Sequence, residues 1–348
     1  MKFIKNIKKR VFSIYKTVKS VSNGKWDFCA LTLDYLYCKL RFKINPDEYL
    51  KYGFYNFSNR YRKQFLLVKH KKLFRNVNQR FFTASKYIFY KRIPDLFERK
   101  IILAPQCGEK AFIDFAKKHK KIIIKPDTGS LGIGIKTFIF TDEDSAKKQF
   151  SEFLYDDPCV CEEFIVQHKM MQELNPASVN TIRIVSVLKG ENVEIVSATL
   201  RTSAKLGCIV DNMANGGVGA QVDIRTGIVS TFGIDYSFNN YTHHPVSGTQ
   251  IIGFKIPNWD LAIKRVKQAH KRLSQCLLFG WDIAITQDGV DIIEANISPG
   301  PRIMQAMDKV PKGQMIIPLI KKDLLKQNKT KKYKFVPDYS RFDYAGEE

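Results

Sequence analysis

The 348-residue sequence predicts an α+β protein with a basic, helical N-terminal extension. In the first 80 residues, apolar side chains recur at the three- and four-residue spacing of amphipathic helices. From about Thr83, short runs rich in Ile and Val alternate with helical stretches, and two pairs of these runs are joined by tight turns typical of antiparallel hairpins. We therefore expect a helical extension over 1–82, an α+β domain over 83–320 and a polar, Lys-rich tail over 321–348.

The positive charge is concentrated near the N-terminus. Residues 1–100 hold 25 Lys and Arg against 6 Asp and Glu, whereas residues 101–299 hold 21 against 22. Such a field attracts anionic lipid, nucleic acid or an acidic polymer, and an evenly solvated Lys-rich surface is the alternative. No apolar run is long enough for a transmembrane helix, and the seven cysteines lack zinc-site spacing. We expect a cytoplasmic protein with reduced thiols.

The first helix is expected over about residues 3–18, where apolar residues alternate with lysines at helical spacing. A basic amphipathic helix of this kind can lie on an anionic membrane, here at its inner face, or dock on the protein's own core. Further helices are expected over 26–43 and 58–72. Four aromatic residues near Arg60 and Arg62 are more typical of a helical core than of base stacking, so we do not expect a nucleic-acid partner (Phe54, Tyr55, Phe57 and Tyr61).

The periodicity assigns the elements of the α+β domain in chain order. Helices are expected over 85–91, 109–120, 142–154 and 258–278. Strands are expected over 101–103, 121–125, 160–165, 181–188, 193–201, 281–285 and 290–295. The hairpin turns at 189–192 and 287–289 contain Gly beside acidic or amide residues, as tight turns require.

The first motif with chemical content is a strand that ends at Lys125-Pro126 and runs into a glycine-rich loop. Gly129, Gly132 and Gly134 allow backbone N–H groups to approach phosphate oxygens, with Ser130 among them, and Lys125 supplies a positive charge. The loop lacks the GK[ST] ending of a Walker A motif and the spacing of a dinucleotide fingerprint. A glycine-rich hairpin without a ligand is the alternative interpretation.

The second motif places oxygen ligands on two adjacent strands. Glu294 and Asn296 are two residues apart and should share a face, while Ala295 points away. The hairpin turn brings Asp282 beside them, so two carboxylates and an amide oxygen form a site suited to Mg²⁺ held jointly with phosphates. Solvated strand residues are the alternative.

The third motif is the acidic strand end at residues 160–165. Backbone groups up to Ile165 could meet an adenine edge, and Glu162 or Glu163 a ribose, although a plain edge strand fits equally well. In their order, the three motifs resemble the ATP-grasp superfamily over about residues 83–310. More narrowly, three stretches resemble its sugar-transfer-associated group: Glu162-Glu163-Phe164-Ile165-x-Gln167-His168, 178–183 ending in Arg183, and Ala295-Asn296-x-x-Pro299-Gly300.

The resemblance implies an ATP-grasp fold, in which two α+β subdomains grip the nucleotide, and it implies site roles. Two lysines would bind the phosphates: Lys125 matches one, and Lys86 is the best candidate for the other, with Lys91 as runner-up. Glu162 and Glu163 match the adenine hinge. Asp282, Glu294 and Asn296 match the ligands of two Mg²⁺ ions, for which Mn²⁺ can substitute. Where a ribose carboxylate often stands the sequence has Asn180, and Glu173 is the alternative.

One departure concerns the arginine that steadies the transferring phosphoryl group in D-alanine–D-alanine ligases, because Gly280 occupies its position. Arg183, Arg201 or Arg302 must supply this charge. The resemblance implies an ATP-dependent carboxylate–amine ligase that acts through an acyl phosphate. We expect a small-molecule or glycan carboxylate and an amine as its partners. The group's name associates it with bacterial surface polysaccharide, for example a uronic acid that receives an amino acid. The alternative is a non-catalytic module that binds nucleotide or polyanion at the membrane surface.

Overall fold

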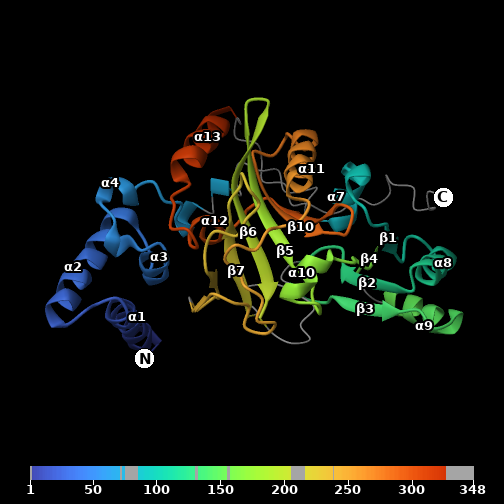
Figure 1. The fold of residues 1–348 in the computed structure, drawn as a ribbon, viewed down its shortest axis with the longest axis horizontal. Coiled ribbons are helices and arrows are strands. Elements are labelled where there is room, and N and C mark those ends of the chain that lie inside the picture. The colour runs from blue at the N-terminus through green and yellow to red at the C-terminus, as the bar shows by residue number, and fades with distance from the viewer. Residues whose placement is uncertain are drawn as a thin grey trace.

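The computed structural model describes residues 2–70, 73–74, 85–129, 132–154, 157–204, 216–237 and 239–326. Figure 1 shows a helical N-terminal unit at one end, a large sheet in the centre and a smaller sheet with its own helices at the other end. The predicted α+β class with an N-terminal helical extension is confirmed.

The N-terminal unit packs around an aromatic core. Its elements are α1 (Lys2–Lys19), α2 (Lys25–Phe42), α3 (Pro46–Lys51), η1 (Phe54–Asn56), α4 (Asn59–Arg62) and η2 (Val68–His70). The predicted aromatic residues belong to this core or pack against it, with Phe54 fully buried. The unit contacts the rest of the protein through Ile234, Ala306 and Met307, which share its hydrophobic cluster.

The helix expected over 58–72 is largely wrong. Within the described residues 58–70, α4 and the short η2 are the only helices, because Phe65, Leu66 and Leu67 are all buried in succession. Phe65 and Leu67 pack into the helical unit, whereas Leu66 joins a second cluster with residues of α13 (Gly313–Lys326). Neighbouring side chains that point to opposite sides require an extended chain rather than a helix.

The central sheet is antiparallel throughout and, within the described residues, has seven strands in the order β11-β10-β5-β6-β7-β8-β9. Its strands are β5 (Thr181–Lys189), β6 (Asn192–Ser203), β7 (Gly217–Val222), β8 (Gly233–Ile234), β9 (Asn240–Tyr241), β10 (Leu278–Ile285) and β11 (Val290–Asn296). Both predicted hairpins, β5–β6 and β10–β11, are confirmed.

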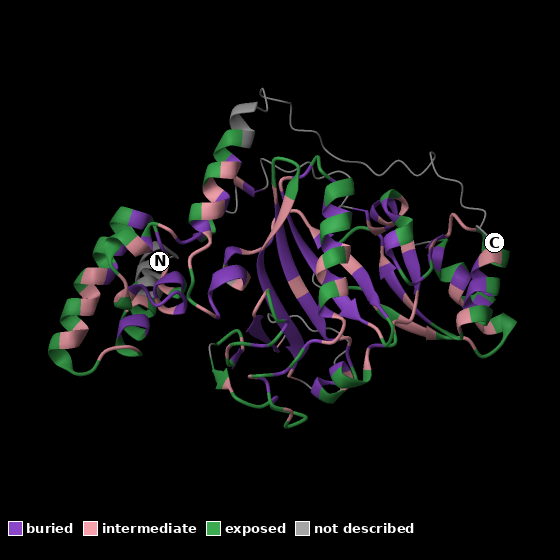
Figure 2. Ribbon diagram, turned by 45° about the horizontal axis from the view of Figure 1, so that its top comes forward, coloured by how far each residue is buried: buried purple, intermediate pink, exposed green. Residues whose placement is uncertain are grey.

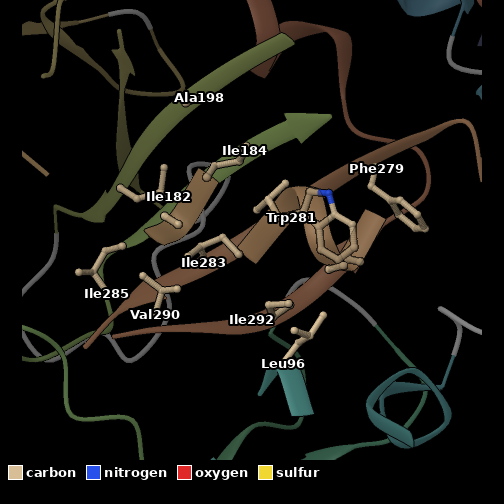
Figure 3. Packing of buried hydrophobic residues seen from close by; sticks show 14 of the residues in the cluster. Leu96, Ile182, Ile184, Ala198, Phe279, Trp281, Ile283, Ile285, Val290 and Ile292 are labelled. Carbon is tan, nitrogen blue, oxygen red and sulfur yellow. The ribbon is translucent and has the colours of Figure 1, made fainter. Parts of the chain in front are cut away.

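One face of this sheet is covered by α11 (Trp259–Arg272) and by α7 (Lys86–Arg92), which continues into η3 (Pro94–Leu96). The main core lies here, and Figure 3 shows Ile182, Ile184, Trp281, Ile283 and Ile292 packed together within it. Residues of α12 (Pro301–Gln305) and α13 pack against Val185, Val187 and Leu278 in a separate cluster.

The small sheet has the strand order β1-β4-β2-β3 within the described residues. Its strands are β1 (Ile101–Ala104), β2 (Lys121–Pro126), β3 (Lys136–Ile139) and β4 (Cys159–Glu163). The helices α8 (Glu109–His119) and α9 (Glu143–Phe153) cover it with their phenylalanines, and Asp142 caps α9. After β4 the chain passes through α10 (Lys169–Leu174) into the central sheet.

A buried arginine ties the two sheets together. The Arg99 guanidinium donates to the Glu162 carboxylate of β4 at 2.9 Å and to the Asp291 carboxylate of β11 at 2.7 Å. All three side chains are almost fully buried. These charge-assisted hydrogen bonds fix the orientation of the sheets in the region where the cavity lies.

Candidate functional site

Both sheets line a cavity of about 740 Å³. It collects most of the residues that the three motifs and the resemblance singled out: Lys86, Lys125, Gly129, Gly132, Glu162, Glu163, Ile165, Arg183, Arg201, Asp282, Glu294 and Asn296. Segments that are far apart in the chain therefore meet in one place. Their roles toward a ligand remain predictions.

Two lysines form the basic side of the cavity. An isolated bridge between Ser85 and Thr128 places the start of α7 beside the glycine loop, and Ser85 caps this helix. Lys86 Nζ donates to the Pro126 carbonyl at 2.7 Å, directly after Lys125 on β2. Burial and the charge of Lys125 lower the pKa of Lys86. An anion bound here would relieve the repulsion between these cations, as phosphates do.

The carboxylate of Glu162 is already engaged. It lies 2.7 Å from Lys125 Nζ as well as 2.9 Å from Arg99 Nε. Burial raises its pKa, but the charges of Arg99 and Lys125 outweigh burial and hold the pKa of Glu162 below its ordinary value. Glu162 therefore orients Lys125 toward the cavity. Glu163, 3.4 Å from His119 Nδ1, is more exposed and stays the better candidate for a polar contact with a ligand.

The glycine loop follows β2 closely. Gly129 and Gly132 line the cavity with positive φ angles of 133° and 75°. Gly134 is not among the lining residues, but a Cβ atom there would come within 2.9 Å of Pro126 Cγ. The loop can therefore turn back on Pro126 only with glycine at this position. Ser130 lies outside the described residues.

Asp282 and Glu294 stand directly opposite each other on β10 and β11. The register shifts after this pair, so that Ile283 faces Ile292 and Ile293 is an extra residue on β11. This bulge lets Glu294 line the cavity although Ile292 points into the core. As the spacing predicts, Asn296 also lines the cavity and donates to Glu294 at 2.9 Å, whereas Ala295 packs in the core.

Two arginines from the neighbouring strands meet Asp282. Arg183 of β5 makes a two-pronged contact with this carboxylate, and Arg201 Nη1 of β6 donates to it at 3.0 Å. Burial raises the pKa of Asp282, but these two charges hold it well below its usual range. Arg183 also explains Gly280, because a Cβ atom at 280 would lie 3.3 Å from Arg183 Cδ and 2.8 Å from Pro299 Cβ.

The donor set fits a divalent cation only together with further oxygen ligands. No group of three or more His, Cys, Asp or Glu side chains in the described part of the chain could hold a metal by itself. Asp282, Glu294 and Asn296 offer hard oxygen atoms, and phosphate oxygens would complete the coordination. Ser298 Oγ lines the same wall and is buried without a hydrogen-bond partner among the described residues, as expected of an atom that meets a ligand.

Five predicted residues contribute no described side chain to the cavity lining. Asn180 is fully buried, where its Nδ2 donates to Gln167 and Met171 and its Oδ1 accepts from Thr202. The Asn180 side chain is turned into the protein and does not line the cavity. The alternatives Glu173 and Lys91 are not among the lining residues either. The side chain of Arg302, at the start of α12, lies outside what the structure describes, as does Ser130.

Sequence reasoning missed a lysine contributed by the helical unit. Lys51 of α3 is buried, lines the cavity and donates from Nζ to the Tyr236 carbonyl at 3.2 Å. Ile303 and Met307 line the same region. Lys51 stands alone in the sequence without a motif, so only the packing of α3 against the strand that holds Ile234 reveals it. Arg99 was missed for the same reason, since its partners lie 63 and 192 residues away.

Residues 50–310 match the family described as sugar-transfer associated ATP-grasp. The chain belongs to this family. The match covers three quarters of the sequence and begins at residue 50, so it includes Lys51 and the end of α3. The predicted resemblance is confirmed. No protein of curated function matches the sequence.

Solved structures similar to this ATP-grasp chain include ligases at low identity. D-alanine–D-alanine ligase from Bacillus anthracis has a TM-score of 0.41 and 15% identity, covering 70% of this chain and 68% of that chain. The ATP-grasp ligase PsnB complexed with minimal precursor has a TM-score of 0.42 and 13% identity, with 70% and 60% covered. D-alanyl-alanine synthetase A from Vibrio cholerae has a TM-score of 0.43 and 10% identity, with 70% and 66% covered. The chain thus spans about 60 to 68% of these proteins.

Proposed function

We propose that the protein is an ATP-dependent carboxylate–amine ligase. The observation that carries this proposal is that two charge clusters line one cavity of an ATP-grasp chain: Lys86 and Lys125 from α7 and β2, and Asp282 with Glu294 from β10 and β11. The lysines suit phosphate oxygens, and the carboxylates suit the cation that accompanies them.

In this proposal the chain acts by positioning and by charge neutralisation. Lys86 and Lys125 bind the nucleotide phosphates, and the wall formed by Phe164, Ile165 and Ile293 receives the adenine. Asp282, Glu294 and Asn296 would hold Mg²⁺, two ions in our proposal, and the cations would offset the negative charge of the phosphates. A substrate carboxylate oxygen attacks the γ-phosphorus and releases ADP. An amine then attacks the acyl carbon of the acyl phosphate, and an amide and phosphate leave.

Arg183 and Arg201 are our candidates for the charge that steadies the transferring phosphoryl group. They reach the cavity from β5 and β6, and Arg183 passes over Gly280, the position where D-alanine–D-alanine ligases carry an arginine. Their pairing with Asp282 also favours the second candidate function, a module that binds nucleotide without turnover, because it occupies a carboxylate that the metal needs. ADP formation separates the two functions.

Lys51 marks the end of the cavity where we place the substrate acid. Its ammonium group is buried between the helical unit and Tyr236, and it is the cation that α3 brings to the lining. Lys51→Met should raise the KM for the acid by about tenfold or more, because a charged hydrogen bond contributes about 1.5–3 kcal/mol. The KM for ATP should change little. Equal changes in both constants would contradict this assignment.

We place the reaction in the cytoplasm, at the inner face of the membrane, and in the synthesis of surface polysaccharide. The family description and the basic N-terminal unit support this setting. A glycan carboxylate such as a uronic acid, joined to an amino acid, has the chemistry that the proposal needs.

A matrix of acids and amines, scored by ADP release and by the mass of the product, tests the proposed function. We expect ADP release to require an acid and to rise with an amine, together with a product lighter than the two substrates by one water. ADP release that ignores both partners would contradict the proposal.

A further inference from the structure

The outer side of α2 carries a row of exposed apolar side chains, which we call the α2 face. Its members recur every three or four residues along the helix: Trp26, Ala30, Leu33, Tyr37 and Leu40. Trp26 is 88% exposed, Leu33 69% and Leu40 83%. Figure 2 shows exposed residues along α2 from its beginning to its end.

The opposite side of α2 is also apolar. Tyr35, Cys38 and Phe42 are buried in the core of the helical unit. A helix with apolar residues on two opposite sides has no net amphipathic direction. The α2 face therefore cannot be recognised from sequence periodicity alone. The packing of the unit already satisfies the inner side. The exposed apolar row on the outer side is therefore not needed for the packing of the unit, and an exposed apolar row of this kind is typical of an interaction surface.

The surroundings of the α2 face are basic. Exposed side chains at both ends of the helix and on α1 carry positive charge: Lys16, Lys19, Lys25, Lys39, Arg41 and Lys43. The helix has two acids, fewer than the six basic side chains. Both oxygens of Asp34 accept hydrogen bonds from Arg62 at 2.8 Å, and Asp27 in the first turn accepts one from the Asn23 backbone N–H. Two copies of this face would bring like charges together, which opposes self-association.

We propose that the α2 face docks on an anionic lipid bilayer, with its apolar row at the acyl boundary and the basic side chains among the headgroups. None of the described helices is both long and apolar enough to cross a membrane, so the helix would lie in the surface. The sequence pattern offers the first helix, α1, for lipid contact, with docking on the protein's own core as the alternative, so this proposal uses a different helix. In α1, Val18 is buried in the core, although Val11, Phe12 and Tyr15 remain exposed.

The helical unit that docks by the α2 face also forms part of the cavity wall, so docking would hold the cavity near the membrane surface. Figure 1 shows α1 and α2 at the end of the molecule, away from the small sheet. The same helical unit supplies Lys51 to the cavity wall. Lipid binding needs no turnover, so failure of the ligase proposal would leave this one intact, and the reverse also holds.

Tryptophan fluorescence gives a direct test with the full chain. Trp26 is exposed, whereas the other two tryptophans, Trp259 and Trp281, are buried. Vesicles that contain phosphatidylglycerol with brominated acyl chains should quench the Trp26 emission, and vesicles of phosphatidylcholine alone should not. Trp26→Phe should remove the quenching but keep binding in a sedimentation assay. Binding to anionic vesicles without quenching would overturn the placement of α2.

Two matched double variants distinguish lipid binding by the α2 face from nonspecific binding by exposed apolar side chains elsewhere. Leu33→Ser with Leu40→Ser should lower the vesicle-bound fraction at least about tenfold. Ile139→Ser with Leu154→Ser removes two apolar side chains that are each 62% exposed, one on β3 and one just after the end of α9, and it should bind like the wild type. Equal binding by both double variants, or a wild-type dimer that the α2 variant dissociates without any lipid binding, would overturn the proposal.

Discussion

Glu294→Gln should lower the rate of ADP formation by at least about 10²–10³-fold, the size of effect expected when one group that stabilises charge at a reacting centre is lost. Glu294 faces Asp282 across β10 and β11 and lines the cavity, so its carboxylate is central to the proposed cation site. An amide keeps the shape and one oxygen but removes the negative charge that a divalent cation needs.

The fold should tolerate this substitution. Burial and the neighbouring Asp282 raise the pKa of Glu294, which means that the folded protein disfavours its charge. A neutral side chain therefore should not lower the free energy of unfolding. Glu191→Gln, in the exposed turn between β5 and β6, is the matched control and should turn over like the wild type. Normal ADP formation by Glu294→Gln would remove the cation site from our account.

Arg99→Met should destabilise the protein by about 3–5 kcal/mol, because it leaves buried carboxylates on both sheets with one partner fewer. Arg99 donates to Glu162 of the small sheet and to Asp291 of the central sheet. Urea unfolding at neutral pH measures the loss. Arg272→Met is the matched control: Arg272 pairs with Asp95 on the surface, and loss of an exposed pair should cost less than about 1 kcal/mol.

The difference between wild type and Arg99→Met should shrink in acid. In the folded protein the charges of Arg99 and Lys125 hold the pKa of Glu162 below its ordinary value, despite burial. The stabilisation is therefore complete above the ordinary pKa of a glutamate and is lost as the pH falls through the lower, folded-state pKa. A difference that stays constant into this acidic range, or an equal loss in Arg272→Met, would contradict the role of the Arg99 bridge.

The sequence was sufficient wherever a local pattern and the tertiary structure agree. The hairpins β5–β6 and β10–β11 have alternating apolar residues and clear turns, so their strands, and the common face of Glu294 and Asn296, follow from spacing. Local patterns failed where tertiary packing decides. The two-residue strands β8 and β9 are too short for periodicity, and the 58–72 helix gives way because Leu66 packs on the side opposite to Phe65.

The site shows the same division. The motif residues could be predicted because they belong to contiguous stretches of sequence. The contacts that hold them in place could not be predicted from the sequence. Arg99 and Lys51 lie outside every motif, and the pairing of Arg183 with Asp282 depends on the register of β5 against β10. Asn180 shows the reverse case, in which a residue at a motif position is used by the core hydrogen bonds of the fold.

Binding of MgATP in the cavity is the central claim, and thermal unfolding of wild type, Lys125→Ala and Lys136→Ala tests it most directly. At a hundredfold excess over Kd, MgATP should stabilise the wild type by about 2.7 kcal/mol, with no such effect of ATP when magnesium is withheld. Lys136→Ala, at an exposed position of β3 in the same sheet, should respond like the wild type, whereas Lys125→Ala should lose the shift. A wild type that MgATP does not stabilise, or an equal shift in Lys125→Ala, would contradict the account.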